Sequence, residues 1–150
     1  MIKDALLAYL HYIAIIVMFA FLTVQIVLMR RTVDAQAARL LARCDMFFGA
    51  ASALILFTGL MRVFMGAKGS AFYMDNPVFW VKVAVFLVAG LLSIRPTILF
   101  LRWAKLAAKD SGFVVAEAEQ RRVRVFLMLE IHLLAVVPLL AALMSRGIGH

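Results

Sequence analysis

Three side chains that carry or can accept positive charge, His11, Arg62 and Lys82, lie within stretches of sequence that are otherwise strongly apolar. If those stretches are antiparallel helices, His11 lies about two turns into the first. Arg62 then lies about one turn before the end of the second, and Lys82 about one turn into the third. All three therefore reach a similar depth. Positive groups in a medium of low dielectric constant repel one another unless an anion lies between them. This arrangement favours a ligand that has both a metal and carboxylates.

Haem b has both features, with the His11 imidazole on the iron and Arg62 and Lys82 on the propionates. An alternative is that the two basic side chains extend to the headgroups and that His11 is a hydrogen-bonded interior histidine. Spacing alone favours this alternative. His11, Met18 and Gln25 recur every seven residues and so share one face of a helix, which indicates that His11 is turned toward other helices.

The last apolar stretch contains Glu130 and His132, which project from nearly opposite faces of a helix. We expect His132 to face the bundle interior as a candidate second iron ligand, or as a structural histidine. Its depth differs from that of His11 by roughly 13 Å at ~1.5 Å per residue. We expect Glu130 to form an ion pair with Arg95, which lies at a similar depth. His150, on the C-terminal tail, is expected to have no role.

Sulfur-containing residues suggest a different metal. The sequence has nine methionines, and thioethers together with imidazole suit Cu(I). Met61 and Met65 share a helix face, whereas most of the others are scattered as core residues would be. The single cysteine, Cys44, excludes an intrachain disulfide and a site of several cysteines. It is expected to be a small apolar residue of the core.

Four hydrophobic stretches must position these residues. They are residues 5–29, 46–65, 78–101 and 125–144. About 20 helical residues cross the ~30 Å hydrocarbon layer of a bilayer, and a backbone in lipid must satisfy its own hydrogen bonds. The sequence therefore predicts an all-α, integral membrane, four-helix antiparallel bundle, with residues 1–150 forming one domain. The first stretch is too long for a signal peptide and is expected to be retained.

The net charge of +8 comes from basic residues that flank the hydrophobic stretches, which argues for a membrane protein and against nucleic-acid binding. Basic residues are concentrated between the first and second stretches and between the third and fourth. The first group is Arg30, Arg31, Arg39 and Arg43, and the second is Arg102, Lys105, Lys109, Arg121, Arg122 and Arg124. The connections themselves are expected at residues 30–43 and 104–120, the second a helical extension broken near Ser111-Gly112. By the positive-inside rule these connections are cytoplasmic and both termini are periplasmic. Fewer basic residues lie on the opposite side: Lys3, Lys68 and Arg146. The glycine-rich turn that begins at residue 66 should end at Asn76-Pro77, where a helix restarts.

Five segments resemble an uncharacterised bacterial family of four-helix predicted membrane proteins over nearly the full chain. They are LHY at residues 10–12, TGLMR at 58–62, NPVFWVK at 76–82, LLSIRPT at 91–97 and AALMSRG at 141–147.

More distantly, the early histidine, the threonine-glycine pair of the second stretch and the tryptophan-x-lysine of the third resemble two other groups. These are the small four-helix protoporphyrinogen IX oxidases of bacteria and the copper-resistance D membrane domain. The oxidase family is associated with haem b and depends on a histidine in its first span. The resemblance implies haem ligation by His11, supported by Arg62 and Lys82. His132 and the charges of Arg95 and Glu130 depart from the family pattern, so haem binding is implied more strongly than the oxidase reaction.

We therefore expect a homo-oligomeric protein of the bacterial inner membrane, a dimer or a trimer, in contact with membrane lipid. It would bind haem b and have a redox role toward quinone or a tetrapyrrole. One alternative is a copper or small-solute transport protein that uses His11, Met18 and the methionines of the second stretch. Another is a structural subunit of a larger membrane complex without a cofactor.

Overall fold

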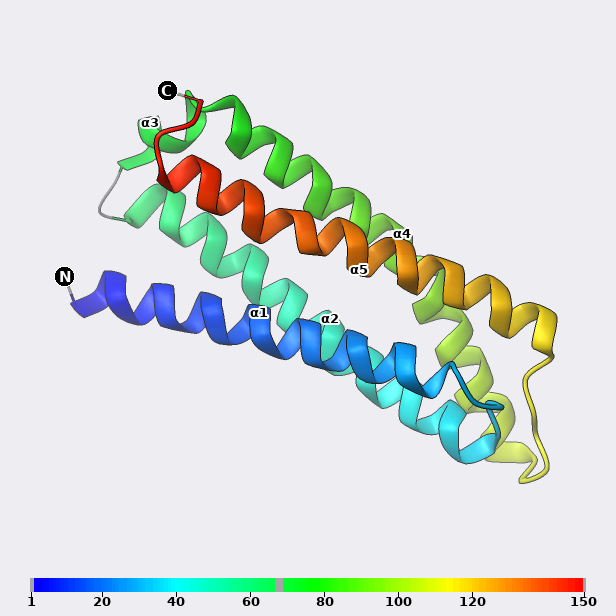
Figure 1. The fold of residues 1–150 in the computed structure, drawn as a ribbon. Helices are drawn as coiled ribbons and strands as arrows, with labels where there is room; N and C mark the ends of the chain where they lie inside the picture. The colour runs from blue at the N-terminus through cyan, green and yellow to red at the C-terminus, as the bar shows by residue number, and fades with distance from the viewer. Residues whose placement is uncertain (1, 67–68, 150) are drawn as a thin grey trace.

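The computed structural model describes residues 2–66 and 69–149; Lys68 and His150 lie outside the described residues. Within these residues, four long helices are joined by short connections and by one short helix (Figure 1). The helices are α1 (Ile2–Leu28), α2 (Ala35–Met65), α3 (Gly69–Met74), α4 (Pro77–Lys109) and α5 (Glu117–Ser145). The four long helices are each long and apolar enough to cross a membrane. The predicted all-α four-helix membrane fold is confirmed.

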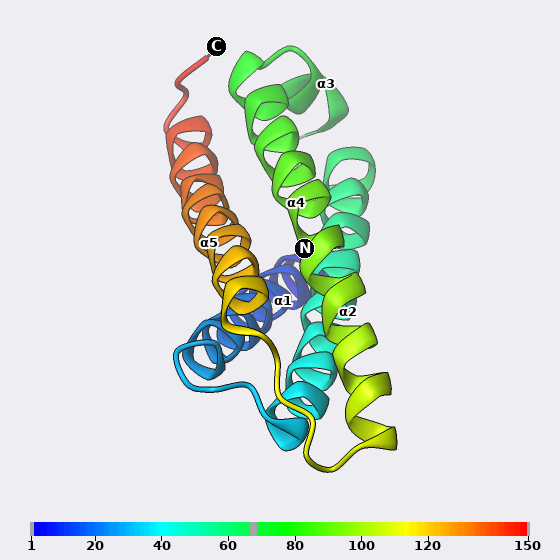
Figure 2. The ribbon, with the colours of Figure 1, turned by 90° about the vertical axis from the view of Figure 1, so that its right-hand side faces the viewer.

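The long helices run antiparallel in chain order, and each packs mainly on its neighbours in the sequence: α1 on α2, α2 on α4 and α4 on α5. Helices α1 and α5 lie close together at one end of the bundle and diverge toward the other (Figures 1 and 2). We call the first the connecting end, because residues 29–34 and 110–116 link the helices there. The second, with both termini and α3, is the terminal end.

Side-chain caps fix where two helices begin. The Asp34 carboxylate accepts a hydrogen bond of 2.8 Å from the Ala37 amide, so α2 begins at Ala35 and includes residues predicted to lie in a connection. The Asn76 side chain accepts one of 2.8 Å from the Val78 amide, and α4 begins at Pro77 as predicted. The predicted break after α4 is also confirmed, since the helix ends at Lys109.

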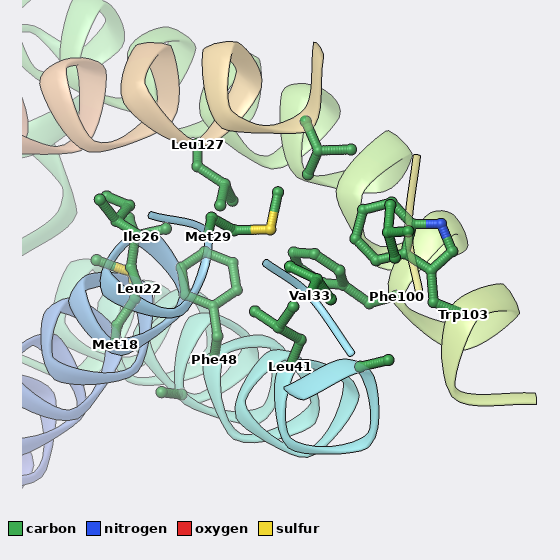
Figure 3. Packing of buried hydrophobic residues seen from close by; sticks show 14 of the residues in the cluster. Met18, Leu22, Ile26, Met29, Val33, Leu41, Phe48, Phe100, Trp103 and Leu127 are labelled. Carbon is green, nitrogen blue, oxygen red and sulfur yellow. The ribbon is translucent and has the colours of Figure 1, made fainter. Parts of the chain in front are cut away.

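Most of the large, fully buried apolar side chains lie near the connecting end, where side chains from all four long helices meet (Figure 3). These side chains include Leu22, Met29, Leu41, Phe100, Trp103 and Leu127. The outer surface is also apolar. Phe64 and Leu91, for example, are 64% and 67% exposed. Such a surface is unusual for a soluble protein and is suited to lipid.

The orientation predicted for α5 is wrong. Glu130 faces the bundle and is 1% exposed, whereas His132 lies on the exposed side, with its Nδ1 2.5 Å from the Met128 carbonyl oxygen. The expected ion pair between Arg95 and Glu130 is not formed within the chain either. The Arg95 guanidinium lies over the Phe126 ring, 5.7 Å from its centroid, and no hydrogen bond reaches Glu130 Oε1. Rotation of each helix about its axis separates the two charges, because Arg95 is exposed while Glu130 points inward.

Candidate ligand cavity at the terminal end

The divergence of the helices leaves a cavity of about 530 Å³ toward the terminal end. Its wall includes His11 from α1, Arg62 from α2 and Lys82 from α4, so the structure brings together the three residues whose depths matched in the sequence. The rest of the wall is mainly apolar, with contributions from all four long helices: Ile15, Met18, Ile55, Val63, Phe79, Phe86, Leu134 and Met144 among them. A mostly apolar cavity with a few polar groups is typical of a binding site for a small molecule or cofactor.

The His11 imidazole is held by α2. Its Nδ1 lies 2.8 Å from Thr58 Oγ1, and that hydroxyl donates its hydrogen to the Leu54 carbonyl at 2.6 Å. Since a hydroxyl has one hydrogen to donate, Thr58 accepts from His11, and the proton of the neutral ring is assigned to Nδ1. Nε2 is then left with its lone pair. Histidines that bind metals through one nitrogen usually donate a hydrogen bond through the other, which fixes the ring as it is fixed here.

A glycine next to Thr58 lets the ring lie close to α2. A Cβ atom built on Gly59 would be 3.5 Å from His11 Cε1, so the imidazole packs directly over the helix at this point. Met18 and Gln25, which share the helical face of His11, are 3% and 1% exposed. The face of α1 predicted to turn toward the other helices is therefore confirmed.

Two aromatic rings support the basic side chains. The Arg62 guanidinium lies 5.6 Å from the centroid of the Tyr12 ring, and Lys82 Nζ lies 5.1 Å from that of Phe79. In the part of the chain that the structure describes, neither side chain forms an ion pair, and no acidic side chain lines the cavity. The cavity is therefore cationic, and an anionic group is the partner that its two charges lack.

A family model for predicted membrane proteins, DUF2214, matches residues 3–149. The chain belongs to the DUF2214 family. The expected membership of a family of predicted membrane proteins is thereby confirmed. Comparisons with curated proteins and with solved structures give no match, so the more distant likeness to the oxidases and to the copper-resistance D domain has no support from them.

Sequence reasoning missed part of this DUF2214 cavity. Thr58 was noticed only as half of a threonine-glycine pair, although it precedes Arg62 by one helical turn and so shares its face. Met61, Met65 and His132, which were candidate metal ligands, do not line the cavity.

Proposed function

We propose that this DUF2214 protein binds haem b in the terminal cavity. His11 Nε2 is the protein ligand to iron, and Arg62 and Lys82 bind the propionates. One observation carries the proposal: a histidine whose Nδ1 is fixed by Thr58 shares an apolar cavity with two cations that have no anionic partner among the described residues. His132 is left out, because it lies on the exposed side of α5.

Different residues of the cavity have different roles in binding such a group. Thr58 sets the tautomer and orientation of the His11 ring. The Arg62 guanidinium lies against the face of the Tyr12 ring and the Lys82 ammonium against the face of the Phe79 ring, and these contacts keep the two cations in place. The apolar wall, which includes Phe86 and Leu134, limits access of water. When bound, haem supplies one-electron chemistry, and the proposed role is electron transfer toward quinone or a tetrapyrrole.

The proposal places the protein in the inner membrane of a bacterium with both termini in the periplasm. Most of the basic residues lie at the connecting end, in the first connection and on the adjoining ends of α2, α4 and α5, whereas the termini lie at the other end (Figure 1). By the positive-inside rule the connecting end is cytoplasmic. A periplasm-dependent reporter fused to the C-terminus should be active, and a cytoplasm-dependent reporter at the same point should not. The reverse pattern would overturn this topology.

Absorption spectra of the purified protein test the haem proposal directly. Oxidised and reduced samples should show a Soret band, and His11→Ala should reduce haem retention by at least about tenfold, because it removes the iron ligand. Arg62→Gln and Lys82→Gln should weaken haem binding without changing the ligand. His132→Ala is the matched control and should retain the parental spectrum. An unaltered Soret band in His11→Ala would exclude His11 as the ligand.

A second candidate is Cu(I) binding, as part of copper transport. It is favoured by two thioethers, Met18 and Met144, which line the same cavity as His11. Titration with Cu(I) against a chromophoric chelator separates the two candidates. Copper binding that Met18→Leu and Met144→Leu abolish, in a protein without a Soret band, would replace the haem proposal. A protein that binds neither would point to the structural-subunit alternative.

The homo-oligomer, a dimer or a trimer, stays a prediction. The ion pair between Arg95 and Glu130 that had supported a subunit contact is not formed within the chain. Light scattering of the protein in mild detergent measures its mass, and a monomer would exclude the homo-oligomer.

A further inference from the structure

A second cavity, of about 480 Å³, lies between α2, α4 and α5. It adjoins the terminal cavity, because Phe86 and Leu134 line both. Its ionisable residues are Asp45 from α2 and Glu130 from α5, and Glu130 is close to the middle of its helix. The haem proposal uses neither carboxyl group.

Within the residues that the structure describes, the two carboxyl groups form no ion pair with a basic side chain. Glu130 is 1% exposed and its Oε1 has no hydrogen-bond partner, while Asp45 is 7% exposed and lies beside Thr97. The two are close enough to influence each other electrostatically. Among the described residues no basic side chain lines this cavity, and Arg124 instead donates to the Met29 carbonyl at 2.7 Å. Buried carboxylates at this depth are costly unless they bind a proton or a positive charge joins them.

The shape of the cavity indicates what kind of cation would fit. A hard metal ion takes about six or more oxygen ligands and would leave most of the apolar wall without contacts. Phe48 and Phe86 form part of that wall, and aromatic faces attract organic cations. The lining also includes Met46 and Leu101, which are 62% and 59% exposed, so the cavity opens on the surface that faces lipid. An amphiphilic molecule dissolved in the bilayer could enter there.

We propose that Asp45 and Glu130 bind the ammonium group of an organic amine that enters from the lipid phase, with its apolar body against Phe48 and Phe86. Hydroxyl oxygens of Ser93 and Thr97, which also line the cavity, are further acceptors for the ammonium hydrogens. This site adjoins the haem site at Phe86 and Leu134, but the charged residues of the two sites differ, so either proposal can fail without the other.

Tryptamine and its neutral analogue tryptophol form a matched pair of probes, since they differ mainly in an ammonium group against a hydroxyl. Binding to the purified full-length protein in detergent is measured by equilibrium dialysis with radiolabelled probe. We expect saturable binding of tryptamine at one site per chain and binding of tryptophol at least about tenfold weaker. Equal binding of both probes, or no saturable binding of tryptamine, would overturn the proposal.

Near-isosteric variants locate the site. Glu130→Gln and Asp45→Asn should each reduce tryptamine affinity by at least about tenfold, because each removes one negative charge while keeping the side-chain shape. Glu119→Gln is the control; this residue pairs with Arg102 at the connecting end and should bind as the parent does. Circular dichroism and gel filtration confirm that each variant is folded. Parental affinity in folded Glu130→Gln and Asp45→Asn would place tryptamine elsewhere and refute this site.

Discussion

The two ends of the bundle use their polar side chains in opposite ways. At the connecting end, polar groups tie separate helices to one another. Gln120 Nε2 donates to the carbonyls of Met29 and Arg31, at 2.9 and 2.6 Å. Arg39 donates to the Ala107 carbonyl at 2.9 Å, and the Val115 amide donates to Val33 at 3.0 Å. These bonds join the first connection to α5 and to the second connection, join α2 to α4, and close the bundle there.

At the terminal end the ties between elements are fewer and the helices diverge (Figure 2). Those that the described residues make include His11 with Thr58 and Asn76 with the Ile148 carbonyl, at 2.8 and 3.2 Å. Arg62 and Lys82 remain available to a ligand instead of closing the structure. The difference teaches that one end of this small bundle provides stability, which allows the other to keep a cavity open between helices.

Removing a large core side chain at the connecting end should have the largest effect. Trp103 is 1% exposed, and Trp103→Ala should cost roughly 3–5 kcal/mol of unfolding free energy, because it leaves a cavity in a dense core. Phe79→Ala at the terminal end should cost less, since that ring already borders open space. Unfolding in mixed micelles with increasing dodecyl sulfate measures both. Equal losses would contradict the contrast between the ends.

Breaking the link between α5 and the connection at residues 29–34 should have the next largest effect. Gln120→Ala removes two hydrogen bonds to backbone carbonyls and should destabilise the protein by about 1–3 kcal/mol, as a buried polar group left unsatisfied does. Gln36→Ala, on the exposed face of α2, is the control and should change little. The same unfolding assay applies, and a Gln120→Ala protein as stable as the control would refute the link.

At the terminal end, loss of a polar contact should affect the ligand more than the fold. Thr58→Val removes the acceptor for His11 Nδ1 and should cost about 0.5–1.5 kcal/mol of stability. Haem affinity should fall about 10–100-fold, because the ring loses the partner that orients it. Thr23→Val, whose hydroxyl bonds only the Phe19 carbonyl of its own helix, should bind haem as the parent does. Unchanged haem affinity in Thr58→Val would show that Thr58 does not position the ligand.

The smallest effect is expected from a change in the part of α2 that contacts the His11 ring. Gly59→Ala adds a Cβ at an ordinary contact distance of 3.5 Å from His11 Cε1 and should stabilise α2 by about 0.5–1 kcal/mol, while haem binding stays unchanged. Gly49→Ala, whose Cβ would meet nothing within 4 Å, should give a similar gain. Loss of haem in Gly59→Ala would indicate that the ring needs more room than the structure gives it.

The sequence by itself determined the membrane class, the four helices and their antiparallel order, because these depend on the length and hydropathy of successive segments. Because the helices are antiparallel, the positions of His11, Arg62 and Lys82 along their stretches were also enough to predict that the three residues lie at one depth. Asn76-Pro77 predicted the start of α4 by itself, because proline is tolerated in the first turn of a helix.

For α4 and α5, only the tertiary structure decided which way the helix is turned. It placed Glu130 inside and His132 outside, separated Arg95 from its expected partner, and joined Thr58 to His11. In a soluble protein the apolar stripe of a helix reveals its buried face. In a membrane the lipid side is as apolar as the interior, so helix orientation depends on close packing between side chains far apart in the sequence.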